Sequence, residues 1–314
     1  MIAVGVQTWS TDLPAVQRFW RAADELGYAR ITYGDGLWDF THDGWTMLGA
    51  LAGATRRARC APAVTYAFDP AAHHPSWLAK RAVTVDHLSG GRLDLRLAVG
   101  AGDVATRTAW ERHGIRYPGG AERVAALEEA IVIVRALWRG ETVEAPGPVF
   151  RLQGARLAPG PCQRPGPPIW VAAMGPRALA LTARRADGWE ASYVTPDGFV
   201  RFSRRLDALL ATAGRPSREL RRSVEADVWL GVSSADRRAW ARQFCAERGV
   251  DLGHAVVDTA LAGAADAVAA RALAYAAAGA TDLMLGFADF PATTMLERFA
   301  RDVLPLLATP MVAR

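Results

Sequence analysis

Residues 84–102 read TVDHLSGGRLDLRLAVGAG, and Asp103, Val104 and Ala105 follow. The apolar run Leu93–Val99 predicts a buried strand, and GAGDVA (100–105) fits the G-x-G-x-x-A pattern of a dinucleotide-binding turn. In a Rossmann fold that turn follows the first strand, opens a helix and precedes an acidic residue at the next strand end by about 20 positions. Here three strand–helix units come first, and Glu122 begins a helix pattern instead. The stretch therefore argues against a Rossmann fold.

Strand-like and helix-like segments alternate along the whole chain, which predicts parallel βαβ units. Eight strands in 314 residues favour an α/β fold of the closed (β/α)₈ or TIM-barrel type, here one domain over 1–314. Between the fourth and fifth strands we expect an insertion, about 103–165, with a long helix (120–140) and a hairpin (142–157). The expected strands are Ile2–Thr8, Arg30–Tyr33, Ala58–Tyr66, Leu93–Val99, Pro168–Ala172, Trp189–Tyr193, Val224–Val232 and Asp282–Gly286.

Composition narrows the class of protein. The formal charge is +5, yet Lys80 is the only lysine and the arginines are scattered, which indicates a GC-rich genome rather than a nucleic-acid-binding face. No apolar run is long enough for a membrane span, and the N-terminus resembles no export signal. Cys60, Cys162 and Cys245 lack the spacing of a disulfide framework or a zinc site. We expect a cytoplasmic protein without a metal centre, nucleic-acid partner or membrane anchor.

Four segments together resemble the bacterial luciferase-like family of flavin- and deazaflavin-dependent oxidoreductases. This resemblance implies a (β/α)₈ barrel with an insertion after the fourth strand, usually a homodimer, and FMN or coenzyme F420 at the C-terminal face. The segments are HHPSWLAKRAVTVDHLSGGRLDLRLAVGAG (73–102), LEEAIVIVRALWRG (127–140), PGPPIWVAAMGPRALALTARRADGW (165–189) and AGATDLMLGF (278–287).

Two glycine-containing turns are candidates for binding the cofactor. Gly100 and Gly102 follow the fourth strand, where the absence of a Cβ lets a flat ring lie close to the backbone; a simple sharp turn is the alternative. Gly175-Pro176-Arg177 opens a helix, whose free N–H groups suit a phosphate. The resemblance extends that phosphate site to Ala173 and Met174, and Ser192 is a second phosphate-ligand candidate.

The end of the third strand, at Ala63, Val64 and Thr65, is the third cofactor-binding candidate. In F420-using relatives a bulge with a non-prolyl cis peptide bond lies behind the deazaflavin ring. The resemblance places that bond between Ala63 and Val64. An ordinary strand end is the alternative interpretation, since such bonds are very rare.

Three residues are candidates for proton transfer. Asp103 stands where some relatives have a catalytic Glu, although an ordinary solvated loop Asp is the alternative. Asp35 is followed by Gly36, where many relatives have a histidine. The sugar-phosphate dehydrogenases of the family use that histidine in acid–base catalysis, so we do not expect this chain to oxidise a sugar phosphate by that mechanism. Tyr66 is a further proton donor.

The expected substrate is a small molecule. Trp9, Trp38 and His73 are expected near the strand ends, where aromatic walls enclose apolar ligands. A metal-binding role for His73 and His74 is not supported, because no spaced Cys/His set accompanies them.

The sequence favours hydride transfer from reduced F420 to an activated C=C or C=N bond. One alternative is an FMN-dependent monooxygenase that uses O₂ and a separate flavin reductase. The other is a flavin-binding relative without catalytic activity, to which the missing histidine at Gly36 lends weight. The cofactor supplies the chemistry in either enzyme, and the protein orients it.

Overall fold

The computed structural model describes residues 2–68, 73–102, 104–233, 236–248 and 255–308. Every expected strand is present, which confirms the strand pattern. The expected Ala58–Tyr66 strand is divided at Val64 into β3 and β4. The barrel strands are β1 (Ala3–Thr8), β2 (Arg30–Gly34), β3 (Arg59–Ala63), β4 (Thr65–Tyr66), β5 (Leu95–Ala98), β8 (Ile169–Ala172), β9 (Gly188–Ser192), β10 (Arg221–Leu230) and β12 (Asp282–Phe287).

The strands form a nearly closed parallel barrel. Their order is β3-β2-β1-β12-β10-β9-β8-β5-β4, and the two ends of this order meet because β4 follows β3 after one residue. An isolated bridge between Cys60 and Leu93 adds a link from β3 to the chain just before β5. The (β/α)₈ prediction is thus confirmed. A short strand that the sequence pattern did not predict, β11 (Leu261–Gly263), pairs with the outer part of β10.

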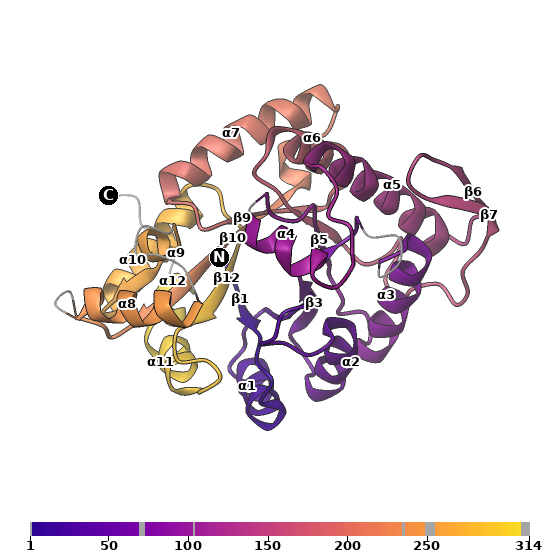
Figure 1. Cartoon of the computed structure of the whole chain (residues 1–314). Helices are drawn as coiled ribbons and strands as arrows, with labels where there is room; N and C mark the ends of the chain where they lie inside the picture. Colours follow the sequence, from indigo (N-terminus) through magenta and orange to yellow (C-terminus); the bar gives the residue numbers. More distant parts are fainter. Residues whose placement is uncertain (1, 69–72, 103, 234–235, 249–254, 309–314) are drawn as a thin grey trace.

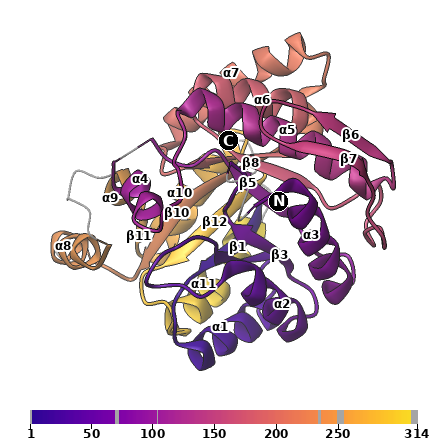
Figure 2. The ribbon, with the colours of Figure 1, turned by 45° about the vertical axis from the view of Figure 1, so that its right-hand side comes forward.

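Helices surround the strands (Figures 1 and 2). In α1, Asp12 caps the N-terminus by accepting from Ala15 N at 3.0 Å, and one face of the helix is buried against the barrel. The helices are α1 (Leu13–Glu25), α2 (Gly44–Ala54), α3 (Pro75–Ser89), α4 (Val104–Glu111), α5 (Gly120–Trp138), α6 (Pro176–Arg185), α7 (Pro196–Thr212), α8 (Arg237–Arg248), α9 (Ala255–Thr259), α10 (Ala265–Ala277), α11 (Thr294–Asp302) and α12 (Leu304–Ala308), with a 3₁₀ turn at Ser217–Glu219. Among the described residues, none of these helices has the length and apolar character to cross a bilayer.

The segment between β5 and β8 contains one regular barrel helix and two additions. α5 packs against both α3 and α6 and so belongs to the outer ring. α4 lies in front of the strands in Figure 1, and the hairpin of β6 (Val143–Pro146) and β7 (Arg151–Ala155) projects beyond α5. The hairpin expected within 142–157 is therefore confirmed.

Charged and aromatic side chains fill the N-terminal half of the barrel. The indole of Trp170 lies 4.7 Å from the guanidinium carbon of Arg30 and 5.1 Å from that of Arg96. A Cβ on Gly188 would come within 2.2 Å of the Trp170 ring, so this position needs glycine. Above this packed base, the C-terminal ends of the strands line a cavity.

Candidate functional site at the C-terminal ends of the strands

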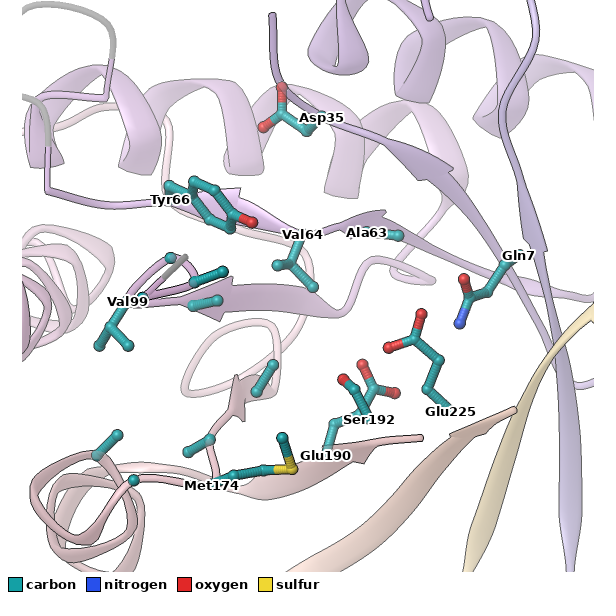
Figure 3. A pocket seen from close by; sticks show the side chains of 18 of the residues that line it. Gln7, Asp35, Ala63, Val64, Tyr66, Val99, Met174, Glu190, Ser192 and Glu225 are labelled. Atoms are coloured by element: carbon teal, nitrogen blue, oxygen red, sulfur yellow. The ribbon is translucent and has the colours of Figure 1, made fainter. Parts of the chain in front are cut away.

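A cavity of about 540 Å³ lies at the C-terminal ends of the barrel strands (Figure 3). Its size is in the range of small-molecule sites, and its position is the face on which TIM barrels carry their active sites. The lining residues are Gln7, Asp35, Trp38, Ala63, Val64, Tyr66, Ala98, Val99, Gly100, Ala101, Gly102, Ala172, Ala173, Met174, Gly175, Ala178, Glu190, Ser192 and Glu225.

One wall is formed by backbone between β3 and β4. The peptide bond between Ala63 and Val64 is cis, as the family resemblance implied, and both residues line the cavity. Thr65, the next residue, is fully buried and does not reach the cavity.

The geometry of the loop after β5 requires glycine at one position of GAGDVA. Gly100 has φ +79°, and a Cβ there would lie 2.3 Å from the Tyr117 hydroxyl oxygen. That hydroxyl donates to Ala101 O at 2.7 Å, and the buried Arg123 donates to Val99 O at 2.6 Å. These bonds hold the loop as a wall with few side chains. Gly102 has open space around it.

The turn after β8 presents the N-terminus of α6 to the cavity. Gly175 is the N-cap residue and supplies no side-chain cap, and Pro176 follows at the first helical position. The N–H groups of the first turn are thus free to bind an anion. Ala173, Met174 and Gly175 line the cavity, whereas Pro176 and Arg177 are exposed beside it. Ser192 lines the cavity from the end of β9.

Asp35 is a buried carboxyl on the cavity wall, 9% exposed. Asp35 accepts a hydrogen bond from the Thr65 hydroxyl. A Cβ added to Gly44 would lie only 2.7 Å from the Cβ of Asp35, so the two segments approach closely. Burial raises the pKa of Asp35, and the negative charge of Asp43 adds to this increase. The charges of His73 and Arg81 and the hydrogen bond from Thr65 lower the pKa and oppose the increase. The net effect keeps Asp35 protonated to a higher pH than an ordinary aspartate.

Tyr66 stands on the same wall, within an aromatic group that includes Phe68 and Trp110 at ring distances of 6.0 and 5.8 Å. Trp38 also lines the cavity. A Cβ on Gly36 would lie 2.5 Å from Trp38 Nε1, so the indole fills the space that a side chain at position 36 would need.

The placement of two expected pocket residues needs correction. Trp9 packs on Phe290 at a ring distance of 4.9 Å, and His73 is buried with Trp110 at 6.5 Å. Neither lines the cavity; the charge of His73 lowers the pKa of Asp35 on the cavity wall. Asp103 lies outside the described residues.

Three polar residues of the cavity are additional to the sequence prediction: Gln7 on β1, Glu190 on β9 and Glu225 on β10. Glu190 forms a buried ion pair with Arg96 and accepts from Ser223 Oγ at 3.0 Å. Burial lowers the pKa of Arg96 to about 9, a shift that the charge of Arg30 increases and that of Glu225 opposes. A signal was present, since carboxylates inside apolar barrel strands require a partner or a function.

Among the described residues, no group of three or more His, Cys, Asp or Glu side chains is arranged to hold a metal ion. The cavity is therefore built from glycine- and alanine-rich backbone, an uncapped helix N-terminus and a few acidic and aromatic side chains. This combination suits an organic cofactor with a flat ring and an anionic group.

Comparison with solved structures shows the fold. The F420-dependent tetrahydromethanopterin reductase from Methanopyrus kandleri superposes with a TM-score of 0.81 at 18% identity, covering 97% of this chain and 99% of that one. A monooxygenase from Streptomyces bottropensis gives a TM-score of 0.78 at 24% identity, with 97% and 99% coverage.

Sequence comparison shows, beyond the fold, to which family the chain belongs. The chain is 36% identical over 185 residues to the phthiodiolone/phenolphthiodiolone dimycocerosates ketoreductase of Mycobacterium bovis (strain BCG / Pasteur 1173P2), which covers 58% of this chain and 45% of that protein. The chain thus spans about half the length of the curated relatives that it matches. The profile described as luciferase-like monooxygenase matches residues 2–289. Because this match includes every strand of the barrel and every described wall of the cavity, the chain belongs to the luciferase-like monooxygenase family.

Proposed function

We propose that the chain is an oxidoreductase that uses reduced coenzyme F420 to transfer a hydride to an activated C=C or C=N bond of a small molecule. The observation that carries the proposal is Asp35, a protonatable carboxyl on the wall of a cavity suited to a flat ring. Reduction of a neutral double bond needs one hydride and one proton, and Asp35 is placed to supply the proton.

The cavity residues fit the cofactor. Ala63 and Val64 would lie behind the ring, and Gly100 and Gly102 would let it approach the backbone. The N-terminus of α6 at Gly175 would hold the phosphate, with Arg177 beside it. Ser192, the second phosphate-ligand candidate, is the register partner of Glu225 on the neighbouring strand, so it lies beside a carboxylate and is a poor place for an anion. The F420-dependent relative, named as a reductase, favours F420 over FMN.

Reduced F420 supplies a hydride when bound. The contribution of the chain is to orient the acceptor and to hold a proton near it. Burial raises the pKa of Asp35 and so favours the protonated carboxyl, and the Thr65 hydroxyl fixes the carboxyl in one orientation. Tyr66 is the second candidate donor on the same wall. The remaining candidate, Asp103, stays a prediction.

A fluorescence titration with F420 and, separately, with FMN tests the cofactor assignment. F420 should bind more tightly than FMN. Preference for FMN would contradict the F420 assignment and support the FMN-dependent monooxygenase, which the family's own description also favours. Binding of F420 without turnover of any acceptor would support the non-catalytic alternative.

Turnover tests the role of Asp35. With reduced F420 and a neutral enone, Asp35→Asn should lower kcat by about a hundredfold to ten-thousandfold, the range for loss of a general acid. Asp39→Asn is the matched control, because Asp39 is an exposed carboxyl in the same loop. Equal kcat in Asp35→Asn and wild type would remove Asp35 from the mechanism.

A further inference from the structure

We propose that Glu225 makes this site selective for acceptors that carry a positive charge on nitrogen, that is, for the iminium form of a C=N bond. The inference rests on the proposed function and narrows its substrate class. It starts from the two carboxylates that line the cavity from neighbouring strands, Glu190 and Glu225.

The two carboxylates have different surroundings. Glu190 is almost fully buried, pairs with Arg96 and accepts from Ser223. Its charge is therefore balanced within the barrel. Glu225 is partly exposed, and in the described part of the chain its carboxylate has neither a hydrogen bond nor an ion pair. Figure 3 shows that the Glu225 carboxylate points into the cavity and that the Gln7 amide points into it as well.

The nearest cation acting on Glu225 is Arg96, which does not line the cavity and already forms the ion pair with Glu190, and the cavity wall itself adds no cation. Among its described residues there is no Lys, Arg or His. A carboxylate without a hydrogen bond or an ion pair at a cavity wall repels anionic ligands and attracts cations. A cationic nitrogen near Glu225 would form a charge-assisted hydrogen bond or ion pair.

The anionic part of the cofactor belongs to another end of the cavity. Met174, which precedes the N-terminus of α6, lies below and to the left of Glu225 and Gln7, with Glu190 and Ser192 between them (Figure 3). This separation leaves the Glu225 end for the substrate. The iminium carbon would accept the hydride, the C=N π electrons would become the nitrogen lone pair, and the positive charge would disappear. Reduced F420 supplies both electrons, is oxidised to F420 and releases its remaining proton to solvent. A permanently cationic iminium takes up no proton, whereas a neutral imine must first take one, which is the proton that the proposed function assigns to Asp35.

The test compares a permanently cationic acceptor, N-methyl-3,4-dihydroisoquinolinium, with chromone, a neutral activated bicycle of similar size. In Glu225→Gln, the ratio of KM for the cation to KM for chromone should rise about tenfold to a hundredfold, the lower part of the range for losing a close charge pair, since this cation has no N–H and interacts with Glu225 by charge alone. The change should lie in KM rather than kcat. Glu225→Asp should retain most of the selectivity. Glu219→Gln, an exposed site just before β10, is the matched control for the loss of one charge.

A binding measurement separates this proposal from the proposed function. Non-reducible N,N-dimethyl-1,2,3,4-tetrahydroisoquinolinium and neutral isochroman are titrated into the cofactor-loaded protein, and the fluorescence of the bound F420 or FMN is followed. Weaker binding of the cation in Glu225→Gln supports charge selection even where no acceptor is turned over, an outcome that would defeat the proposed function alone. An unchanged preference for the cation, or a loss of cofactor affinity in Glu225→Gln, would overturn the proposal.

Discussion

Asp35 and Asp94 are two buried aspartates at opposite ends of the same barrel, and their environments act on them in opposite directions. Asp94, 1% exposed, contacts Arg30 Nε at 2.6 Å and Arg59 Nη2 at 2.6 Å. Burial alone would raise the pKa of Asp94, but the two guanidinium groups outweigh it and the pKa is lowered. Asp35 has the Thr65 hydroxyl as its hydrogen-bond donor, and burial raises its pKa.

The difference separates a structural carboxyl, Asp94, from the carboxyl that we propose as the proton donor, Asp35. The negative charge of Asp94 is fixed by cations at the closed base of the barrel and faces no cavity. Asp35 faces the cavity without an equally strong counter-charge, and burial raises its pKa, so it holds its proton to a higher pH than an ordinary aspartate. Burial of a carboxyl therefore does not identify a functional site, whereas burial at the cavity wall with a raised pKa does.

The largest effect is expected from Asp94→Asn. The change leaves Arg30 and Arg59 without a shared anion in a buried position, which should lower the free energy of unfolding by about 3–5 kcal/mol. Because the folded pKa of Asp94 lies below the unfolded value, its contribution is present above pH 3.8 and is lost as the pH falls through the folded pKa. Urea unfolding at pH 7 measures the change. A loss no larger than that of the exposed control Asp39→Asn would contradict the structural role.

Gly100→Ala is the corresponding test at the open end. A positive φ costs an ordinary residue about 1–2 kcal/mol, and the new Cβ would meet the Tyr117 hydroxyl. We expect a loss of folding free energy of at least this size together with weaker cofactor binding. Thermal unfolding and F420 titration measure the two effects. Gly114→Ala, a positive-φ glycine with open space around it and outside the cavity wall, should lose stability but keep cofactor affinity; equal affinity losses in both variants would contradict the cavity argument.

Asp35→Asn should change stability in the opposite direction to Asp94→Asn. The folded pKa of Asp35 is raised, so the folded state binds more protons than the unfolded state, and stability falls as the pH rises from 3.8 to the folded pKa. Removing the ionisable group should raise the free energy of unfolding at pH 8 by about 0.5–2 kcal/mol, the usual range for a single stabilising substitution. Comparing urea unfolding at pH 4 and pH 8 tests this. A variant less stable than wild type at pH 8 would show that the carboxylate is well accommodated.

The sequence was sufficient for the fold because barrel strands are short apolar runs with regular spacing. The same information could predict the cis bond at Ala63–Val64 and the helix start at Gly175 by family resemblance, since both are backbone features tied to local motifs. It could not place His73 and Trp9, because their orientation depends on packing with Trp110 and Phe290. Glu190 and Glu225 are parts of strands whose inward positions become known only from the sheet register.

The smallest effect is expected from Thr65→Val, which removes one hydrogen bond and keeps the shape of the side chain. The bond favours the ionised form of Asp35, so its loss should raise the pKa of Asp35 further and cost about 1 kcal/mol of stability. If Asp35 is the proton donor, activity with a neutral enone falls as the pH rises through the pKa of Asp35. The descending limb of the pH profile of kcat should therefore move to higher pH in Thr65→Val. A limb that stays in place or moves to lower pH would assign it to another group, with Tyr66 the next residue to examine on the same wall.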